Sequence, residues 1–147
     1  MVQEIKKILL VEDNLNDIEL TLDALSEHKL ANSVDVVRDG EEALDYLFKR
    51  GKYEKRDGGS PTLVMLDIKL PKVSGLEILR QLKNDEKLKK IPIVMLTSSK
   101  ENSDLEEAYR LGTNAYVVKP VDFHDFVDAV KHLGIFWGLI NEAPIIN

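Results

Sequence analysis

Five short apolar runs, each followed by a segment with helical periodicity, place the strongest constraint on how this chain can fold. Four of the runs are continuously apolar, as in strands that are buried on both faces of a parallel sheet, and the second run alternates. Strands that alternate with amphipathic helices are typical of a doubly wound α/β fold, so we predict a five-stranded parallel sheet covered by helices. The predicted strands are residues 8–11, 33–38, 63–66, 91–96 and 115–118, and the predicted helices are residues 16–28, 43–48, 75–84, 103–112 and 122–133.

The length and composition fit one globular domain. At 147 residues the chain can bury a sufficient core without disulfides, and it contains no cysteine. The apolar run Ile8–Val11 is shorter than a signal peptide requires, and far shorter than the roughly 20 residues of a membrane span. We therefore predict a cytoplasmic protein with no membrane partner. The net charge of −6 argues against nucleic-acid binding, which usually depends on clustered Lys and Arg.

One basic segment, KRGKYEKRDGGSP at residues 49–61, departs from this acidic balance. It is open to two interpretations, a docking surface for an acidic partner or a solvated loop. Its three glycines and its proline favour the loop.

Polar side chains follow four of the five predicted strands. Glu12 and Asp13 follow the first strand, and Asp67 follows the third. Thr97 follows the fourth strand, and Lys119 follows the fifth. Because parallel strands end at the same edge of a sheet, we expect these side chains to converge there. Each of them also has an ordinary structural explanation, such as a helix cap or a strand end, but their convergence favours a functional site.

The chemistry of these side chains indicates a phosphoryl-transfer site. Two carboxylates about 4 Å apart repel by roughly 4 kcal/mol at an effective dielectric constant of 20, so three of them require a cation. Oxygen ligands in an open cleft suit Mg²⁺, and no histidine or cysteine is placed to favour zinc. With a metal present, Asp67 can stay ionised and attack phosphorus, while Thr97 and Lys119 donate hydrogen bonds to the phosphoryl oxygens.

The sequence resembles the receiver domain of two-component response regulators, the CheY-like family, over about residues 6–132. The resemblance implies a flavodoxin-like (βα)5 fold with the strand order 2-1-3-4-5. It also implies a function in phosphorelay signalling, in which Asp67 accepts a phosphoryl group from a sensor histidine kinase in a Mg²⁺-dependent reaction. Such a protein is a signalling phosphoacceptor rather than an enzyme, although it takes part in its own phosphorylation and dephosphorylation.

The resemblance also assigns roles within the site. Asp13 would bind Mg²⁺ directly, Glu12 would act mainly through a metal-bound water, and the backbone carbonyl of Lys69 would complete the metal ligands together with Asp67. Lys119 would contact the phosphoryl group, and a cis peptide would join it to Pro120.

Two further positions concern switching and lifetime. Phosphorylation would draw Thr97 inward and let Tyr116 turn in, which would bias the face formed by the fourth helix, fifth strand and fifth helix. Lys69 and Ser99 occupy positions that vary in the family and tune the lifetime of the phosphoryl group, and the sequence leaves that lifetime open.

The chain divides into a receiver domain at residues 1–133 and a tail at residues 134–147, LGIFWGLINEAPIIN from Leu133 onward. The tail is too short for an output domain, so we predict a stand-alone regulator. Its apolar residues Ile135, Phe136 and Leu139 favour a homodimer through the tail, or through the fourth helix, fifth strand and fifth helix, over a tail folded back on its own domain. The FW pair and the NEAP ending resemble regulators that partner phytochrome-type histidine kinases.

Three other classes compete with this reading. An aspartate-nucleophile phosphatase would carry a second acid two residues after Asp67, where this chain has Lys69. A nucleotide hydrolase would need a glycine-rich loop after the first strand, and VEDNLND has no glycine. A receiver-like module that binds partners without phosphorylation would normally lack Asp67, Thr97 or Lys119, and all three are present.

Overall fold

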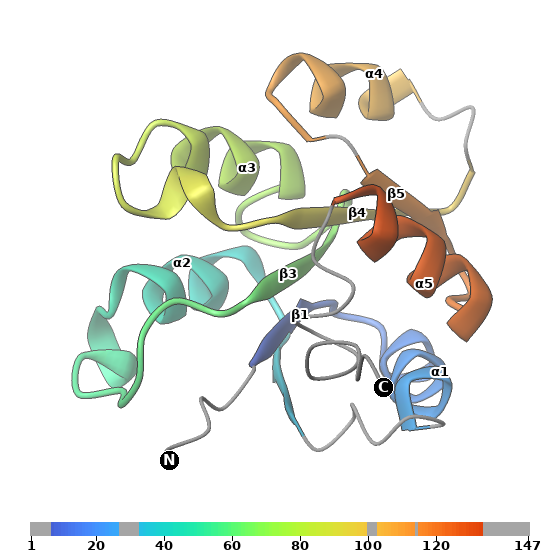
Figure 1. Cartoon of the computed structure of the whole chain (residues 1–147). Coiled ribbons are helices and arrows are strands. Elements are labelled where there is room, and N and C mark those ends of the chain that lie inside the picture. Colours follow the sequence, from blue (N-terminus) through green and yellow to red (C-terminus); the bar gives the residue numbers. More distant parts are fainter. Residues whose placement is uncertain (1–6, 27–32, 100–102, 114, 134–147) are drawn as a thin grey trace, which may run out of the picture.

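The computed structural model describes residues 7–26, 33–99, 103–113 and 115–133, in which strands and helices alternate along the chain (Figure 1). The strands are β1 (Ile8–Val11), β2 (Val34–Val37), β3 (Leu63–Asp67), β4 (Ile93–Thr97) and β5 (Ala115–Val118). The α-helices are α1 (Leu15–Ser26), α2 (Gly40–Phe48), α3 (Gly75–Lys83), α4 (Ser103–Arg110) and α5 (Phe123–His132). Short 3-10 turns occur at η2 (Gly51–Tyr53) and η3 (Leu88–Lys90).

All five strands form one parallel sheet in the order β2-β1-β3-β4-β5. The predicted α/β class and strand order are therefore confirmed. The chain first moves outward from β1 to β2 and then crosses back to β3 on the other side of β1. In sheets of this kind the cleft lies beyond the carboxyl ends of the strands, at the point where the order reverses. Here that point lies between β1 and β3.

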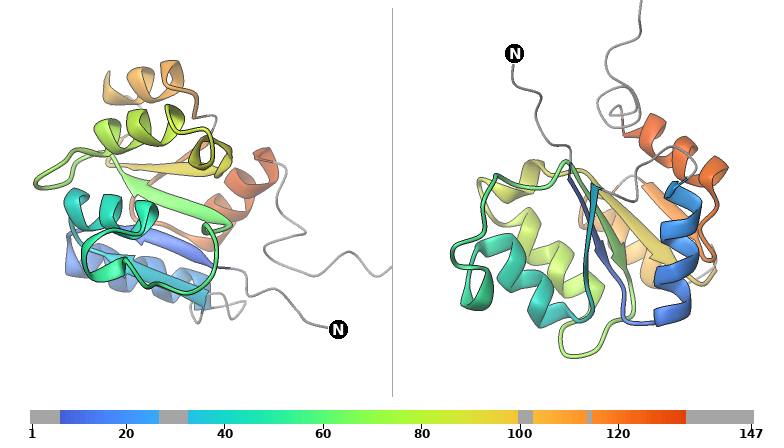
Figure 2. Two further views of the ribbon diagram at one scale, coloured as in Figure 1. Left: turned by 90° about the vertical axis from the view of Figure 1, so that its left-hand side faces the viewer. Right: turned by 90° about the horizontal axis from the view of Figure 1, so that it is seen from below.

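The helices cover both faces of the sheet. Figure 2 shows α1 and α5 on one side and α2 and α3 on the other, and α4 packs beside α3. Each strand therefore contributes alternate side chains to two separate cores, which is why the strands read as continuous apolar runs. Among the described residues, no helix is long and apolar enough to cross a membrane.

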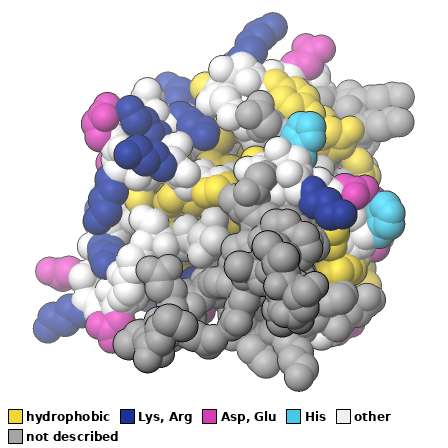
Figure 3. Space-filling model, viewed as in Figure 1, with side chains coloured by type: hydrophobic (Ala, Val, Ile, Leu, Met, Phe, Trp, Pro, Cys, Tyr) yellow, Lys and Arg dark blue, Asp and Glu magenta, His cyan; other side chains and the backbone are white. Residues whose placement is uncertain are grey.

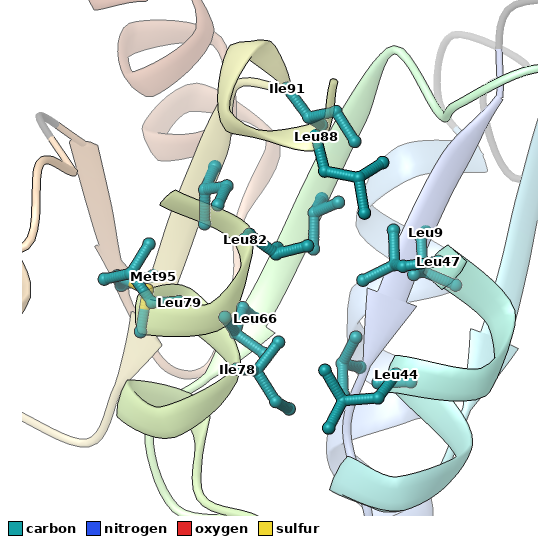
Figure 4. Packing of buried hydrophobic residues seen from close by; sticks show 14 of the residues in the cluster. Leu9, Leu44, Leu47, Leu66, Ile78, Leu79, Leu82, Leu88, Ile91 and Met95 are labelled. Atoms are coloured by element: carbon teal, nitrogen blue, oxygen red, sulfur yellow. The ribbon is translucent and has the colours of Figure 1, made fainter. Parts of the chain in front are cut away.

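The core beneath α2 and α3 is built almost entirely from branched aliphatic side chains (Figure 4). Leu66 of β3 and Met95 of β4 point from the sheet toward the apolar face of α3. Burying one such side chain stabilises the fold by roughly 1.5–3 kcal/mol relative to leaving it exposed. The labelled members from the helices and turns are Leu44, Leu47, Ile78, Leu79, Leu82, Leu88 and Ile91.

The observed strands differ from their predicted bounds by one residue at both ends of β2 and at the last residue of β3 and β4, and by two residues at the start of β4. We predict the fourth strand from residue 91, but β4 begins at Ile93. The polypeptide from Leu88 to Lys90 forms the η3 turn, and the amide of Ile91 donates to the carbonyl of Leu88 within it. Pro92 has no amide hydrogen to donate, so regular pairing starts one residue later.

Residues 49–61 form an irregular connection that contains the η2 turn, and part of it packs on α2. The guanidinium of Arg56 lies 4.1 Å from the centre of the Tyr46 ring and donates to the Tyr46 carbonyl. Lys52 pairs with Glu42 at 2.9 Å. Figure 3 shows Lys and Arg side chains gathered on the side where α2 and α3 lie. Two of the cations in this segment thus serve its attachment to the domain.

Candidate functional site

The carboxyl ends of β1 and β3 bring three acids together. Glu12 and Asp13 directly follow β1, and Asp67 is the last residue of β3. Because the two strands are parallel neighbours, with Val11 beside Leu66, their ends meet at one edge of the sheet. One carboxylate oxygen from each acid lies within 4.8 Å of the other two. Glu12 and Asp67 are buried, whereas Asp13 is exposed.

The ammonium of Lys119 lies among these acids. Its Nζ atom is 2.9 Å from Oδ2 of Asp67 and 3.2 Å from Oε1 of Glu12. The backbone amide of Lys119 donates to the carbonyl of Thr97 at 2.7 Å, which ties the end of β5 to the end of β4. The peptide between Lys119 and Pro120 is cis. The side chain is therefore aimed at the sheet edge from the strand farthest from β1.

The electrostatics of the site indicate an excess of negative charge. Burial, together with the hydrogen bond and charge of Asp67, raises the pKa of Glu12 to about 7, because these effects outweigh the lowering by the Asn14 amide and the Lys119 charge. Burial alone would lower the pKa of Lys119, but its hydrogen bond with Asp67 and the charges of Asp67 and Glu12 raise it above its ordinary value. Lys119 thus keeps its positive charge, but a single positive charge does not neutralise the three acids.

This shift makes the stability of the metal-free protein depend on pH. Between about pH 4.5 and 7, folded Glu12 binds more proton than unfolded Glu12, so the free energy of unfolding falls as the pH rises through that window. We expect a loss on the order of 3 kcal/mol from this residue. Urea unfolding in chelator at several pH values measures it, and the Glu12→Gln variant should lack this part of the slope. Parallel curves for the two proteins would contradict the expectation.

Thr97 is buried at the end of β4, and its hydroxyl is engaged locally. The Oγ1 atom donates to the carbonyl of Ser99 at 2.8 Å and accepts from the Ser99 amide at 3.3 Å. Tyr116 lies on β5, half-buried, with its ring edge-on to that of Tyr109 at a centroid distance of 6.3 Å. Thr97 thus lies beside the cluster, and Tyr116 lies toward α4.

Lys69 lies on the connection from β3 to α3. Its amide donates to Oδ1 of Asp67 at 3.0 Å, and its side chain is exposed. Gly75, the first residue of α3, returns close to this segment, since its amide donates to the carbonyl of Ile68 at 2.9 Å. The backbone around Lys69 is therefore held against the end of β3.

Two residues that the sequence analysis did not single out also contact the site. Oδ2 of Asp17, in the first turn of α1, lies 3.1 Å from Nζ of Lys119. The guanidinium of Arg38 donates to the backbone carbonyl of Asp13 at 3.0 Å. The sequence held a signal for Asp17, the third acid of VEDNLND, one helical turn after Asp13. No sequence pattern pointed to Arg38, apart from its position directly after β2.

The predicted interface residues Ile135, Phe136 and Leu139 lie outside the described residues. The same holds for the whole of the predicted tail.

The donor set of the cluster fits a hard divalent cation. The three clustered side chains offer only carboxylate oxygens, and Mg²⁺ prefers such ligands. The raised pKa of Glu12, which burial and then the neighbouring Asp67 cause, fits a site whose acids would be stabilised by a cation in addition to Lys119. Residues of the cluster could therefore hold a divalent metal.

Known proteins resemble this chain in both sequence and fold. The sequence profile of the response regulator receiver domain matches residues 8–131. The response regulator Rcp1 of Synechocystis sp. is 36% identical over 132 residues, which cover 90% of this chain and 88% of that protein.

Solved structures resemble the fold over nearly its whole length. The bacteriophytochrome response regulator AtBRR is 57% identical, with a TM-score of 0.87 over 95% of this chain and 100% of that chain. The phosphorylated cyanobacterial phytochrome response regulator RcpA is 38% identical, with a TM-score of 0.76 over 96% and 99%. The Mn²⁺-bound form of Rcp1 is 32% identical, with a TM-score of 0.73 over 97% and 99%.

Proposed function

The chain belongs to the response regulator receiver domain family, and from that premise we propose that it accepts a phosphoryl group from a sensor histidine kinase. Asp67 is the acceptor, and the reaction depends on Mg²⁺. Phosphorylation then switches contacts with other proteins, as in two-component phosphorelay signalling. The similarity to regulators named for phytochromes favours a phytochrome-type kinase as the phosphoryl donor.

One observation carries this proposal, the fixed orientation of the buried Asp67 carboxylate. One oxygen accepts from the Lys119 ammonium at 2.9 Å, and the other accepts from the Lys69 amide at 3.0 Å. Two more acids lie beside it, with oxygens within 4.8 Å. A lone buried carboxylate would cost several kcal/mol, so an arrangement that concentrates acids here favours a role in chemistry.

Asp13, Asp67 and the carbonyl of Lys69 would hold the Mg²⁺, with Glu12 acting through a bound water. When bound, the ion supplies positive charge that offsets the acids and the oxygens of the incoming phosphoryl group. An oxygen of Asp67 then forms a bond to phosphorus as the bond between phosphorus and the donor's leaving group breaks. The leaving group departs with the electron pair of that bond.

Lys119 and Thr97 would stabilise the transferred group by donating hydrogen bonds to its oxygens. Lys119 already points at Asp67, whereas the Thr97 hydroxyl must give up its 2.8 Å bond to Ser99. That exchange would draw Thr97 toward Asp67 and leave space that Tyr116 can occupy. The conformational change would then reach the face formed by α4, β5 and α5.

Incubation with acetyl phosphate tests the proposal. We expect the intact mass to increase by one phosphoryl group in Mg²⁺ and to stay unchanged in chelator, because three neighbouring acids would repel the anionic donor without a cation. Circular dichroism in both samples controls for folding. A folded protein that gains no phosphoryl group in Mg²⁺ would instead favour a receiver-like module that binds partners without phosphorylation.

The exposed apolar side chains of α1 suggest where the kinase docks. Leu15 is 59% exposed and Leu20 is 39% exposed, although both are large and apolar. We expect Leu20→Asp to slow phosphotransfer from a cognate histidine kinase about tenfold, since it places a charge in an apolar contact. The rate with acetyl phosphate should stay unchanged, because Leu20 lies outside the acidic cluster. Equal transfer rates from the kinase to both proteins would rule out this docking surface.

Homodimerisation is proposed through the face formed by α4, β5 and α5 or through residues 134–147. A groove of about 420 Å³ on this face is lined in part by Tyr109, which is 44% exposed, and by Tyr116. Tyr109→Glu should weaken a dimer through the groove at least tenfold in sedimentation equilibrium. A chain that ends at residue 133 separates the two routes, since only a dimer through the tail would then dissociate. A monomer at every concentration of the unmodified chain would contradict both.

A further inference from the structure

We infer that Asp17 is a positioning residue that holds the Lys119 ammonium beside Asp67 during phosphoryl transfer. The inference rests on the proposed function, because it concerns the same reaction. It assigns a role to a fourth acid at the site, which comes from a helix rather than from the end of a strand.

The geometry uses all the hydrogen-bonding capacity of one ammonium. Nζ of Lys119 lies 2.9 Å from Asp67, 3.1 Å from Asp17 and 3.2 Å from Glu12. An ammonium has three N–H donors, so each donor has one carboxylate. The side chains of Lys119 and Asp17 are 17% and 24% exposed, and solvent screens such a pair less than it screens a surface ion pair.

A helix-capping role does not account for the Asp17 side chain. An acid at this position of a first turn often reaches back to the amide of the N-cap residue. Here the Asn14 amide donates instead to Oε2 of Glu12 at 3.2 Å. The Asn14 side chain accepts from the Asp17 amide at 3.0 Å, which fixes the backbone of Asp17. The Asp17 carboxylate is thus available to Lys119, which lies 102 positions later in the sequence.

This arrangement restricts the lysine before the reaction begins. A free lysine side chain loses rotamer entropy when it is ordered. Asp17 and Glu12 keep two N–H donors occupied, so the third is directed at Asp67. When the phosphoryl group arrives, only that third donor changes its acceptor. Such preorganisation raises the rate of the chemical step without a new contact to the phosphodonor.

A double-mutant cycle tests the inference. The rate of phosphorylation by acetyl phosphate is measured in saturating Mg²⁺ for four proteins: the unmodified chain, Asp17→Asn, Lys119→Met and the double variant. Asp17→Asn should lower the maximal rate about tenfold when Lys119 is present. It should change the rate less than twofold when Lys119 is methionine, because the group it positions is gone. The Mg²⁺ concentration for half-maximal rate should change less than twofold in Asp17→Asn.

Asp17→Glu gives a second readout that does not depend on the folding of the Lys119 variants. A glutamate keeps the charge within reach of Lys119, so it should recover at least half of the rate that Asp17→Asn loses. Equal losses in both Lys119 backgrounds, an unchanged or faster Asp17→Asn, or a failed rescue by Asp17→Glu would each overturn the inference. If the unmodified chain itself gains no phosphoryl group, the proposed function fails rather than the role of Asp17.

Discussion

Asp67→Asn should abolish phosphorylation by acetyl phosphate, with a rate at least about 100-fold below that of the unmodified chain. The carboxamide has nearly the same shape and can still accept from the Lys69 amide, now at 3.0 Å from Oδ1. It lacks the negative charge that attacks phosphorus and that would help to bind Mg²⁺. Intact mass after incubation in Mg²⁺ measures the effect.

The same variant makes a second, independent measurement possible. Asp67 raises the pKa of Glu12 through a hydrogen bond and through its charge. Removing that charge should return the pKa of Glu12 toward its ordinary value, so the fall in stability between about pH 4.5 and 7 should shrink. We expect a folded Asp67→Asn protein that is at least as stable as the unmodified chain near pH 7 without metal.

Asp57→Asn is the matched control, because Asp57 is an exposed acid in the connection between α2 and β3. It should leave both the phosphoryl gain and the pH profile unchanged. Phosphorylation of Asp67→Asn to the extent of the unmodified chain would show that another side chain is the acceptor. Peptide mapping of the phosphorylated protein would then identify that side chain.

Gly75→Ala should destabilise the fold by about 3 kcal/mol. A Cβ atom on Gly75 would lie 2.1 Å from the carbonyl oxygen of Asp67 and 2.9 Å from Cα of Ile68. Real Cβ atoms do not approach backbone this closely, so α3 or the end of β3 must shift. Either shift breaks the bond from the Gly75 amide to the Ile68 carbonyl. Urea unfolding measures the loss.

The variant should also weaken Mg²⁺ binding, since the displaced backbone includes Asp67 and leads directly into Lys69. Gly59→Ala is the matched control, because a Cβ atom there would meet nothing within 4 Å and its backbone needs no left-handed conformation. We expect it to change stability by less than about 0.5 kcal/mol. Equal stability of the two variants would mean that the chain near Gly75 relaxes without cost.

The sequence alone determined the class of the fold and placed every element boundary except the start of α2 to within two residues. Continuous runs of branched apolar residues bury side chains on both faces of a strand when helices cover both sides of the sheet. Their alternation with helical segments therefore favours a parallel sheet. Parallel strands end at one edge, and this simple rule was enough to group Glu12, Asp13, Asp67 and Lys119. The start of β4 was missed because the η3 turn before it depends on local hydrogen bonds that the apolar pattern does not report.

The tertiary structure decided what those residues contact. That Lys119 has Asp17 as a third partner, that Thr97 bonds to Ser99, and that Gly75 lies against Asp67 could not be read from the pattern. The hydrophobic pattern of the sequence indicates which face of a strand or helix is buried, because buried side chains recur with the period of that element. Contacts across the sheet edge depend instead on where each helix lies along the sheet and on which rotamer each side chain adopts. Packing among residues that lie far apart in the chain determines both.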